Sequence, residues 1–62
     1  MIVKIRFDAA DYSWDGPENG WRGHDDRLRV EWYDGPNQFG LPVAREHFNL
    51  TPEGIAEMLE VI

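Results

Sequence analysis

The sequence predicts a small α+β domain: a three-stranded, mostly antiparallel sheet with a C-terminal helix packed on one face. Two observations carry this prediction. Apolar residues alternate with other residues in three segments, and a period of two is typical of half-buried strands. The C-terminal segment instead repeats its apolar positions every three to four residues, which is typical of an amphipathic helix. With 62 residues, the chain is expected to form one domain spanning residues 1–62.

Two strands are predicted from alternation of apolar and charged residues. The first covers residues 3–7, in which Val3, Ile5 and Phe7 alternate with Lys4 and Arg6. The second covers residues 27–33, in which Leu28, Val30 and Trp32 alternate with Arg27, Arg29 and Glu31. Both strands therefore turn their apolar side chains toward one face of the sheet and their charges toward the other.

The third strand is predicted after a chain reversal. Residues 34–37 read Asp-Gly-Pro-Asn, and proline and glycine favour a turn there. Phe39, Leu41 and Val43 then alternate over residues 39–43. Because Pro42 has no amide donor, this segment is expected to be an edge strand.

The C-terminal helix is predicted to begin after Thr51, which is a favourable capping residue. Pro52 suits the first helical position, and Glu53 places a negative charge near the positive end of the helix dipole. Leu50 and Ile55 have the spacing of a hydrophobic staple. The apolar stripe expected to cover the sheet consists of Ile55, Met58, Leu59 and Ile62.

The segment from residue 8 to residue 26 is the long, aromatic-containing connection between the first two strands. Trp14 and Trp21 flank the turn-rich residues 15–20, so a short hairpin with two indoles facing each other is expected. The core is expected to take Phe7, Trp32, Phe39 and Phe48. Four aromatic residues then remain for the surface or for a smaller cluster: Tyr12, Trp14, Trp21 and Tyr33.

The composition limits the classes of function. The net charge of −6 disfavours a simple nucleic-acid binder, because phosphate binding requires a positive field. The absence of cysteine excludes disulfides and thiolate metal sites. No apolar run reaches the roughly 18 residues of a membrane helix, so an unprocessed cytoplasmic protein is expected.

The charges are predicted to lie on opposite sides of the molecule. Alternation places Lys4, Arg6, Arg27 and Arg29 on the open sheet face, with Glu31 among them. On the helix, Glu53, Glu57 and Glu60 form an anionic stripe opposite the apolar face. This stripe either serves solubility alone or imitates a row of phosphates in the cationic groove of a partner.

The signals for chemistry are weak. Asp11, Ser13, Asp15 and Gly16 match the first half of a calcium-binding loop, but position twelve is Arg22 where a glutamate is required. A metal held by His24, Asp25, Asp26 and His47 with Asp8 or Asp11 has no recognised spacing. Ser13 is the only hydroxyl nucleophile candidate not used as a cap, and so small a domain leaves little room for a pocket of roughly 300 Å³ or more. We therefore expect no enzymatic activity, no cofactor and no metal.

The sequence favours a small acidic protein-binding module, such as a phage or mobile-element accessory or inhibitor of anti-CRISPR or anti-defence type. It would dock on a larger, basic, nucleic-acid-handling partner, without binding nucleic acid or membrane itself. Aromatic residues on a charged loop are typical of interface hot spots. The expected partner-binding residues are Tyr12, Trp14, Asp15, Glu18, Trp21, Asp25, Asp26, Glu53, Glu57 and Glu60.

Three alternatives stay open. A nucleic-acid-binding module would use Lys4, Arg6, Arg27 and Arg29, with Tyr33 as a stacking platform. A small Asp/His metal-binding domain is the less favoured alternative. A homodimer is also compatible with the sequence, because a core this small gains stability from association.

Overall fold

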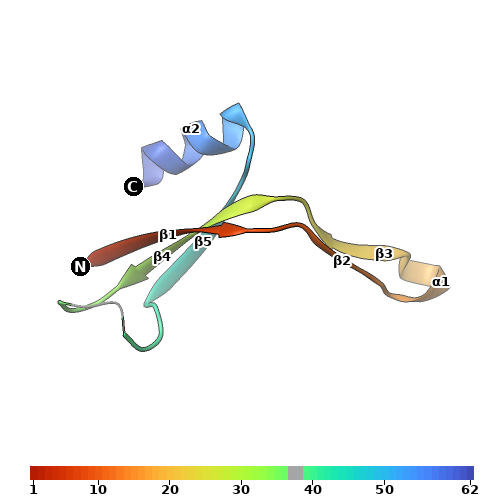
Figure 1. The fold of residues 1–62 in the computed structure, drawn as a ribbon, viewed down its shortest axis with the longest axis horizontal. Helices are drawn as coiled ribbons and strands as arrows, with labels where there is room; N and C mark the ends of the chain where they lie inside the picture. Colours follow the sequence, from red (N-terminus) through yellow and green to blue (C-terminus); the bar gives the residue numbers. More distant parts are fainter. Residues whose placement is uncertain (37–38) are drawn as a thin grey trace.

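The fold is α+β, as predicted (Figure 1). The computed structural model describes residues 1–36 and 39–62. Along the chain its elements are β1 (Ile2–Asp8), β2 (Asp11–Trp14), α1 (Gly16–Asn19), β3 (Trp21–His24), β4 (Arg27–Tyr33), β5 (Ala44–Asn49) and α2 (Pro52–Val61). Neither helix in the described part of the chain is long and apolar enough to cross a membrane.

The main sheet has the order β1-β4-β5 and is antiparallel throughout. The central strand β4 places Val30 opposite Ile5 of β1 and opposite Glu46 of β5. The first two predicted strands are confirmed. β1 is one residue longer at each end than the predicted 3–7, and β4 has the predicted bounds. The sheet thus has an apolar face, toward which Val30 points, and a polar face, toward which Arg29 and Glu31 point.

The hairpin β2-α1-β3 projects from the sheet as an arm (Figure 1). We define this arm as residues 11–24. The molecule measures 46 × 28 × 15 Å and has a radius of gyration of 14.3 Å. A compact chain of this length has a radius of gyration of about 10.6 Å. The arm therefore makes the protein elongated and keeps the hairpin apart from the core.

The prediction of a third strand over residues 39–43 is wrong. The strand is β5, and Phe39, Leu41 and Val43 are 85%, 90% and 61% exposed. Alternation does not mark β5 because Phe48 is its only large apolar residue, while Ala44 and Glu46 occupy the other positions of the apolar face. Within the predicted turn, residues 34–36 form bends, and Asn37 lies outside the described residues.

The core is small and lies between β4, β5 and α2. It consists of Val30, Phe48 and Met58, with Leu28 and Trp32 packed against them. Phe48 and Trp32 were expected here. Phe7 and Phe39 were also expected, and this was wrong, because they are 62% and 85% exposed. Phe7 stays exposed because α2 packs mainly against β5 and leaves the apolar face of β1 uncovered.

The helix α2 begins as predicted: Thr51 Oγ1 accepts a hydrogen bond of 3.0 Å from the amide of Gly54. Met58 is buried against the sheet as predicted, but the other buried residue is Gly54, so the helix is rotated relative to the predicted stripe. Ile55, Leu59 and Ile62 are 36%, 64% and 49% exposed. The cause is the missing side chain of Gly54, which lets the first helical turn approach the backbone of Asn49 closely.

Candidate functional site

The arm is a short antiparallel hairpin closed by one helical turn. β2 and β3 pair from Asp11 opposite His24 to Trp14 opposite Trp21. At the tip, the amide of Asp15 donates to the carbonyl of Gly20, and the amide of Gly20 donates to the carbonyl of Gly16, both at 2.8 Å. These bonds satisfy the backbone where the chain reverses, so the tip has a defined conformation.

Gly23 is required by the geometry of the arm. It has φ of +151°, and a Cβ atom on it would lie 1.8 Å from the carbonyl oxygen of Asp11. No side chain fits at that distance from the backbone. Gly23 therefore lets the two strands come together opposite Tyr12.

The predicted pairing of the two indoles is confirmed. The rings of Trp14 and Trp21 are T-shaped, with centroids 5.6 Å apart and an interplanar angle of 68°. This edge-to-face arrangement is favourable for aromatic quadrupoles. Both rings remain exposed, Trp14 to 58% and Trp21 to 69%. Alternation along β2 places Tyr12, which is 49% exposed, on the same face of the hairpin.

The four acidic residues predicted around the arm divide between its tip and its base. At the tip, Asp15 lies 3.5 Å from Arg22, and Glu18 is exposed on α1. At the base, Tyr12 donates its hydroxyl to Asp25, and Asp26 accepts a 2.7 Å bond from the amide of Ala10. The hydrogen bond to Asp25 raises the pKa of Tyr12. The carboxylates at the base thus hold the arm to the sheet, whereas those at the tip face solvent.

No protein family, curated protein or solved structure matches this chain. The functions considered below are therefore inferred from the geometry of the sites.

Besides the arm, the polar face of the main sheet carries a second concentration of charged side chains.

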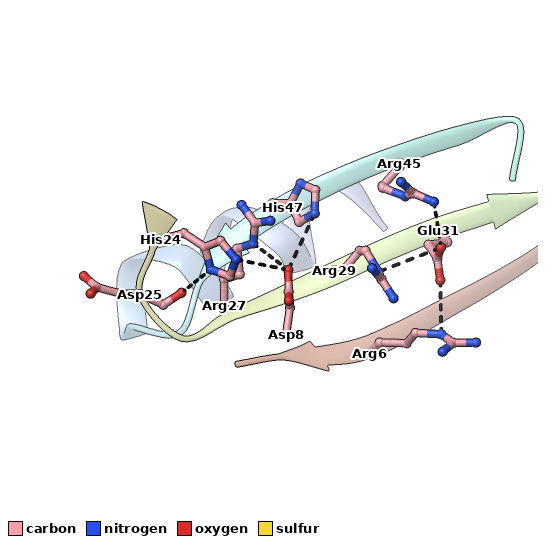
Figure 2. Close-up of polar contacts among 9 residues, drawn as sticks. All are labelled: Arg6, Asp8, His24, Asp25, Arg27, Arg29, Glu31, Arg45 and His47. Atoms are coloured by element: carbon pink, nitrogen blue, oxygen red, sulfur yellow. Dashed lines mark hydrogen bonds and ion pairs between the residues drawn. The ribbon is translucent and has the colours of Figure 1, made fainter. Parts of the chain in front are cut away.

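The polar face is organised around Glu31, which is only 4% exposed (Figure 2). Its carboxylate lies between guanidinium groups from all three strands: Arg6 at 3.2 Å, Arg29 at 3.8 Å and Arg45 at 3.4 Å. Only the contact with Arg45 has hydrogen-bond geometry, and Oε1 of Glu31 lacks a hydrogen-bond partner. The cluster is therefore held mainly by charge, with one buried anion under several cations.

A second cluster surrounds Asp8 at the end of β1 (Figure 2). Arg27 donates to Asp8 Oδ2 at 2.7 Å, and Nε2 of both His24 and His47 lies 3.9 Å from the same oxygen. The hydrogen bond from Arg27 lowers the pKa of Asp8, against a smaller opposing effect of burial. Burial lowers the pKa of His47, and the nearby Arg27 adds to this shift.

The structure brings together part of the metal set considered from the sequence. Asp8, His24 and His47 meet, but Arg27 already occupies the oxygen of Asp8 that faces the two imidazoles. Among the described residues, no group of three or more His, Asp or Glu side chains is arranged to hold a metal ion. In the calcium-like segment, Asp11 lies in β2, and Asp15 pairs with the arginine that replaces the required glutamate.

The predicted sorting of charge is observed. The polar face carries the four predicted cations, Lys4, Arg6, Arg27 and Arg29. It also carries Arg45 of β5, which was not predicted because the third strand was expected at residues 39–43. The face thus holds five of the six cations and two of the twelve carboxylates of the chain. α2 packs on the other face, where Glu53, Glu57 and Glu60 are exposed. Tyr33 is only 5% exposed, which leaves little ring surface for stacking a base.

An open surface cavity lies between the two connections that join the arm to the main sheet, the end of β5 and the start of α2. It has a volume of about 420 Å³, which exceeds the room expected for so small a domain. Its lining residues are Ala10, Asp25, Asp26, Asn49, Leu50 and Thr51. Asp25 and Asp26 are already engaged in the bonds at the base of the arm, and Thr51 caps α2. The cavity is therefore built from groups that hold the fold together.

Proposed function

We propose that the protein is a docking module that binds a larger protein through the tip of its arm. The observation that carries this proposal is the pair Trp14 and Trp21, ordered against each other while more than half of each side chain remains exposed. Tryptophans are enriched among the residues that dominate binding energy at interfaces. Because this pair is already ordered in the free protein, docking requires little further loss of conformational entropy.

The charge around the arm defines the chemistry of the partner. Asp15, Glu18, Asp25 and Asp26 surround an arm that carries one arginine, Arg22. A basic surface complements this charge and accelerates association. If that surface is where the partner holds nucleic acid, docking excludes the nucleic acid, and the protein acts as an inhibitor of the anti-defence type. Glu53, Glu57 and Glu60 supply a second acidic surface to a partner large enough to reach α2.

The test compares three forms of the chain: the wild type, a Trp14→Ala, Trp21→Ala double variant and a Leu41→Ala control. Leu41 is 90% exposed and lies outside the arm. The control therefore removes exposed apolar surface from another part of the molecule. A protein captured from a lysate of the source cells is purified, and its affinity for each form is measured by calorimetry. Loss of a hot spot costs about 2 kcal/mol or more, or roughly 30-fold in affinity.

We expect the double variant to lose at least that much affinity and the control to bind like the wild type. Circular dichroism establishes that the double variant retains the main sheet. A folded double variant with full affinity contradicts the proposal. Addition of the partner's nucleic acid tests the inhibitor hypothesis, because competition is expected only if both ligands use one surface.

A second candidate function follows from the five cations on the polar face, which suit a phosphate backbone. Glu31 and Asp8 offset part of that charge, and every arginine on the face lies in an ion pair with one of them. Direct nucleic-acid binding predicts a gel shift that weakens steeply with salt and is lost in Arg6→Gln, Arg45→Gln. The same double substitution leaves docking through the arm unchanged, so the two functions are distinguishable.

A further inference from the structure

The strand β1 has an edge that pairs with no other strand among the described residues. It is seven residues long, contains neither proline nor glycine, and pairs with β4 in regular register on its other edge. Proteins usually protect such an edge by proline, by bulges, by a covering segment or by charged side chains, lysine above all. Among the described residues, β1 shows only the last of these devices, in Lys4, Arg6 and Asp8 on the polar face. Its outward amides and carbonyls can therefore pair with a further strand whose charges match these.

The apolar side chains of β1 are also uncovered. Val3, Ile5 and Phe7 point to the same face as the core but are 43%, 45% and 62% exposed. On the same side of the sheet, Leu59 of α2 is 64% exposed. Val30 is the only large side chain in the described part of the chain that is completely buried. So thin a core is typical of small domains that gain stability from association.

We propose that β1 pairs antiparallel with β1 of a second copy of the chain, with Arg6 on the two-fold axis. In this register Ile5 lies opposite Phe7 of the second copy, and Lys4 lies opposite Asp8. Residues directly opposite in antiparallel strands share a face, so the apolar faces of both sheets join on one side. Ile5 of each copy thereby contacts Phe7 of the other, which buries part of the apolar surface that α2 leaves exposed.

The charges on β1 select this register. Two contacts between Lys4 and Asp8 form across the axis through Oδ1 of Asp8, because Arg27 already occupies Oδ2. Opposite charges in directly facing positions are stabilising. The two facing copies of Arg6 repel each other, but each lies 3.2 Å from its own Glu31. Placing Ile5 on the axis instead puts Lys4 opposite Arg6 twice. Placing Phe7 on the axis leaves only residues 6–8 of each strand paired.

The other edge strand is less suited to this association. In β5, Phe48 is already buried beneath α2, and the apolar face otherwise presents Ala44 and Glu46. Pairing through β1 gives a continuous six-stranded sheet with the two helices on one face. Because the arm follows the C-terminal end of β1, the two arms point in opposite directions. The proposal goes beyond docking and does not depend on it.

The first test is the mass of the purified chain across a range of concentrations, measured by light scattering or analytical ultracentrifugation. We expect the mass to rise from 7.2 kDa toward twice that value as the concentration increases. Phe7→Glu is expected to abolish the increase, whereas Leu41→Glu, at a 90% exposed apolar position outside β1, is expected to preserve it. A mass that stays at that of the monomer up to millimolar concentration overturns the proposal.

The second test fixes the register by oxidation of single-cysteine variants, since the chain has no cysteine of its own. Arg6→Cys places two cysteines opposite each other at a Cα separation of about 4.5–5.5 Å, within the range for a disulfide. We expect rapid cross-linking of Arg6→Cys and slow cross-linking of Ile5→Cys and Phe7→Cys. Faster cross-linking at either neighbouring position overturns the register. Equal rates at all three positions overturn the strand pairing.

Discussion

A Cβ atom on Gly54 would lie 2.0 Å from the carbonyl oxygen of Asn49, so the first turn of α2 rests directly on the backbone at the end of β5. An alanine in a helix is ordinarily favoured over glycine by about 1 kcal/mol. Here the added methyl group must displace the helix, and overpacking of this kind costs about 1–3 kcal/mol. We expect Gly54→Ala to lower the free energy of unfolding, measured by urea denaturation.

The matched control for that substitution is Ala56→Gly, at an exposed position of the same helix. It is expected to cost about 1 kcal/mol through helix propensity alone. A Gly54→Ala protein as stable as the wild type, or more stable, would show that the close approach between α2 and β5 does not form.

Glu31 is expected to stabilise the main sheet because its carboxylate is buried between three guanidinium groups. Glu31→Gln keeps the shape of the side chain but leaves the arginines facing one another without an anion. Loss of a charged, buried partner costs about 1–3 kcal/mol when the remaining charges are partly solvated. Urea denaturation of Glu31→Gln is compared with Glu46→Gln, an exposed residue on the other face of the sheet. Equal stability of the two variants would exclude a structural role for the cluster.

His47 is expected to make the protein less stable in mild acid. Burial lowers its pKa below the ordinary value of 6.5, and Arg27, Arg29 and Arg45 act in the same direction, while Asp8 opposes them. Between 6.5 and the lowered pKa, the unfolded chain binds more protons than the folded one. Stability is therefore complete above pH 6.5 and declines as the pH falls through this window.

The measurement for His47 is the melting temperature of the wild type and of His47→Gln between pH 7.5 and pH 5. We expect the melting temperature of the wild type to fall relative to that of His47→Gln as the pH decreases from 7.5 to 5. The contribution of Asp8 does not interfere, because its pKa is lowered from 3.8 and its stabilisation is lost only at more acidic pH. Parallel curves would contradict the assignment to His47.

The arm is expected to open independently of the main sheet, because the core cluster lies entirely outside residues 11–24. Amides of β2 and β3 should exchange with solvent through openings of lower free energy than the amide of Val30. Trp21→Ala removes a T-shaped pair that is worth about 0.5–1.5 kcal/mol. Hydrogen exchange should show a corresponding loss of protection in the arm alone. An equal loss at Val30 would mean that the arm and the sheet unfold as one unit.

The parts of the fold that were predictable from the sequence are those fixed by local patterns. β1 and β4 follow from alternation, the hairpin from turn residues between two tryptophans, and the start of α2 from Thr51 and Pro52. β5 was misplaced because an edge strand with one face partly covered needs few apolar residues. Only Phe48 marks it, whereas the better alternation at residues 39–43 belongs to an exposed connection.

The remaining features depend on contacts between different elements rather than on a pattern within one element. The rotation of α2 is set by the approach of Gly54 to Asn49 at the end of β5, which no periodicity within the helix reveals. The burial of Glu31 depends on Arg45, which reaches it only because β5 pairs with β4 in the observed register. The tip of the arm was predictable as a candidate site, because both tryptophans belong to one local hairpin.

The separation of charge between the two sides of the sheet means that net charge is a poor guide to how this protein meets a surface. In an electric field the molecule moves as an anion, in keeping with its charge of −6. A negatively charged resin or lipid headgroup layer nevertheless encounters an oriented molecule, because its field turns the arginines of β1, β4 and β5 toward it. Adsorption therefore depends on the distribution of charge as well as on its sum, and ionic strength is expected to alter retention on cation exchangers above the isoelectric point.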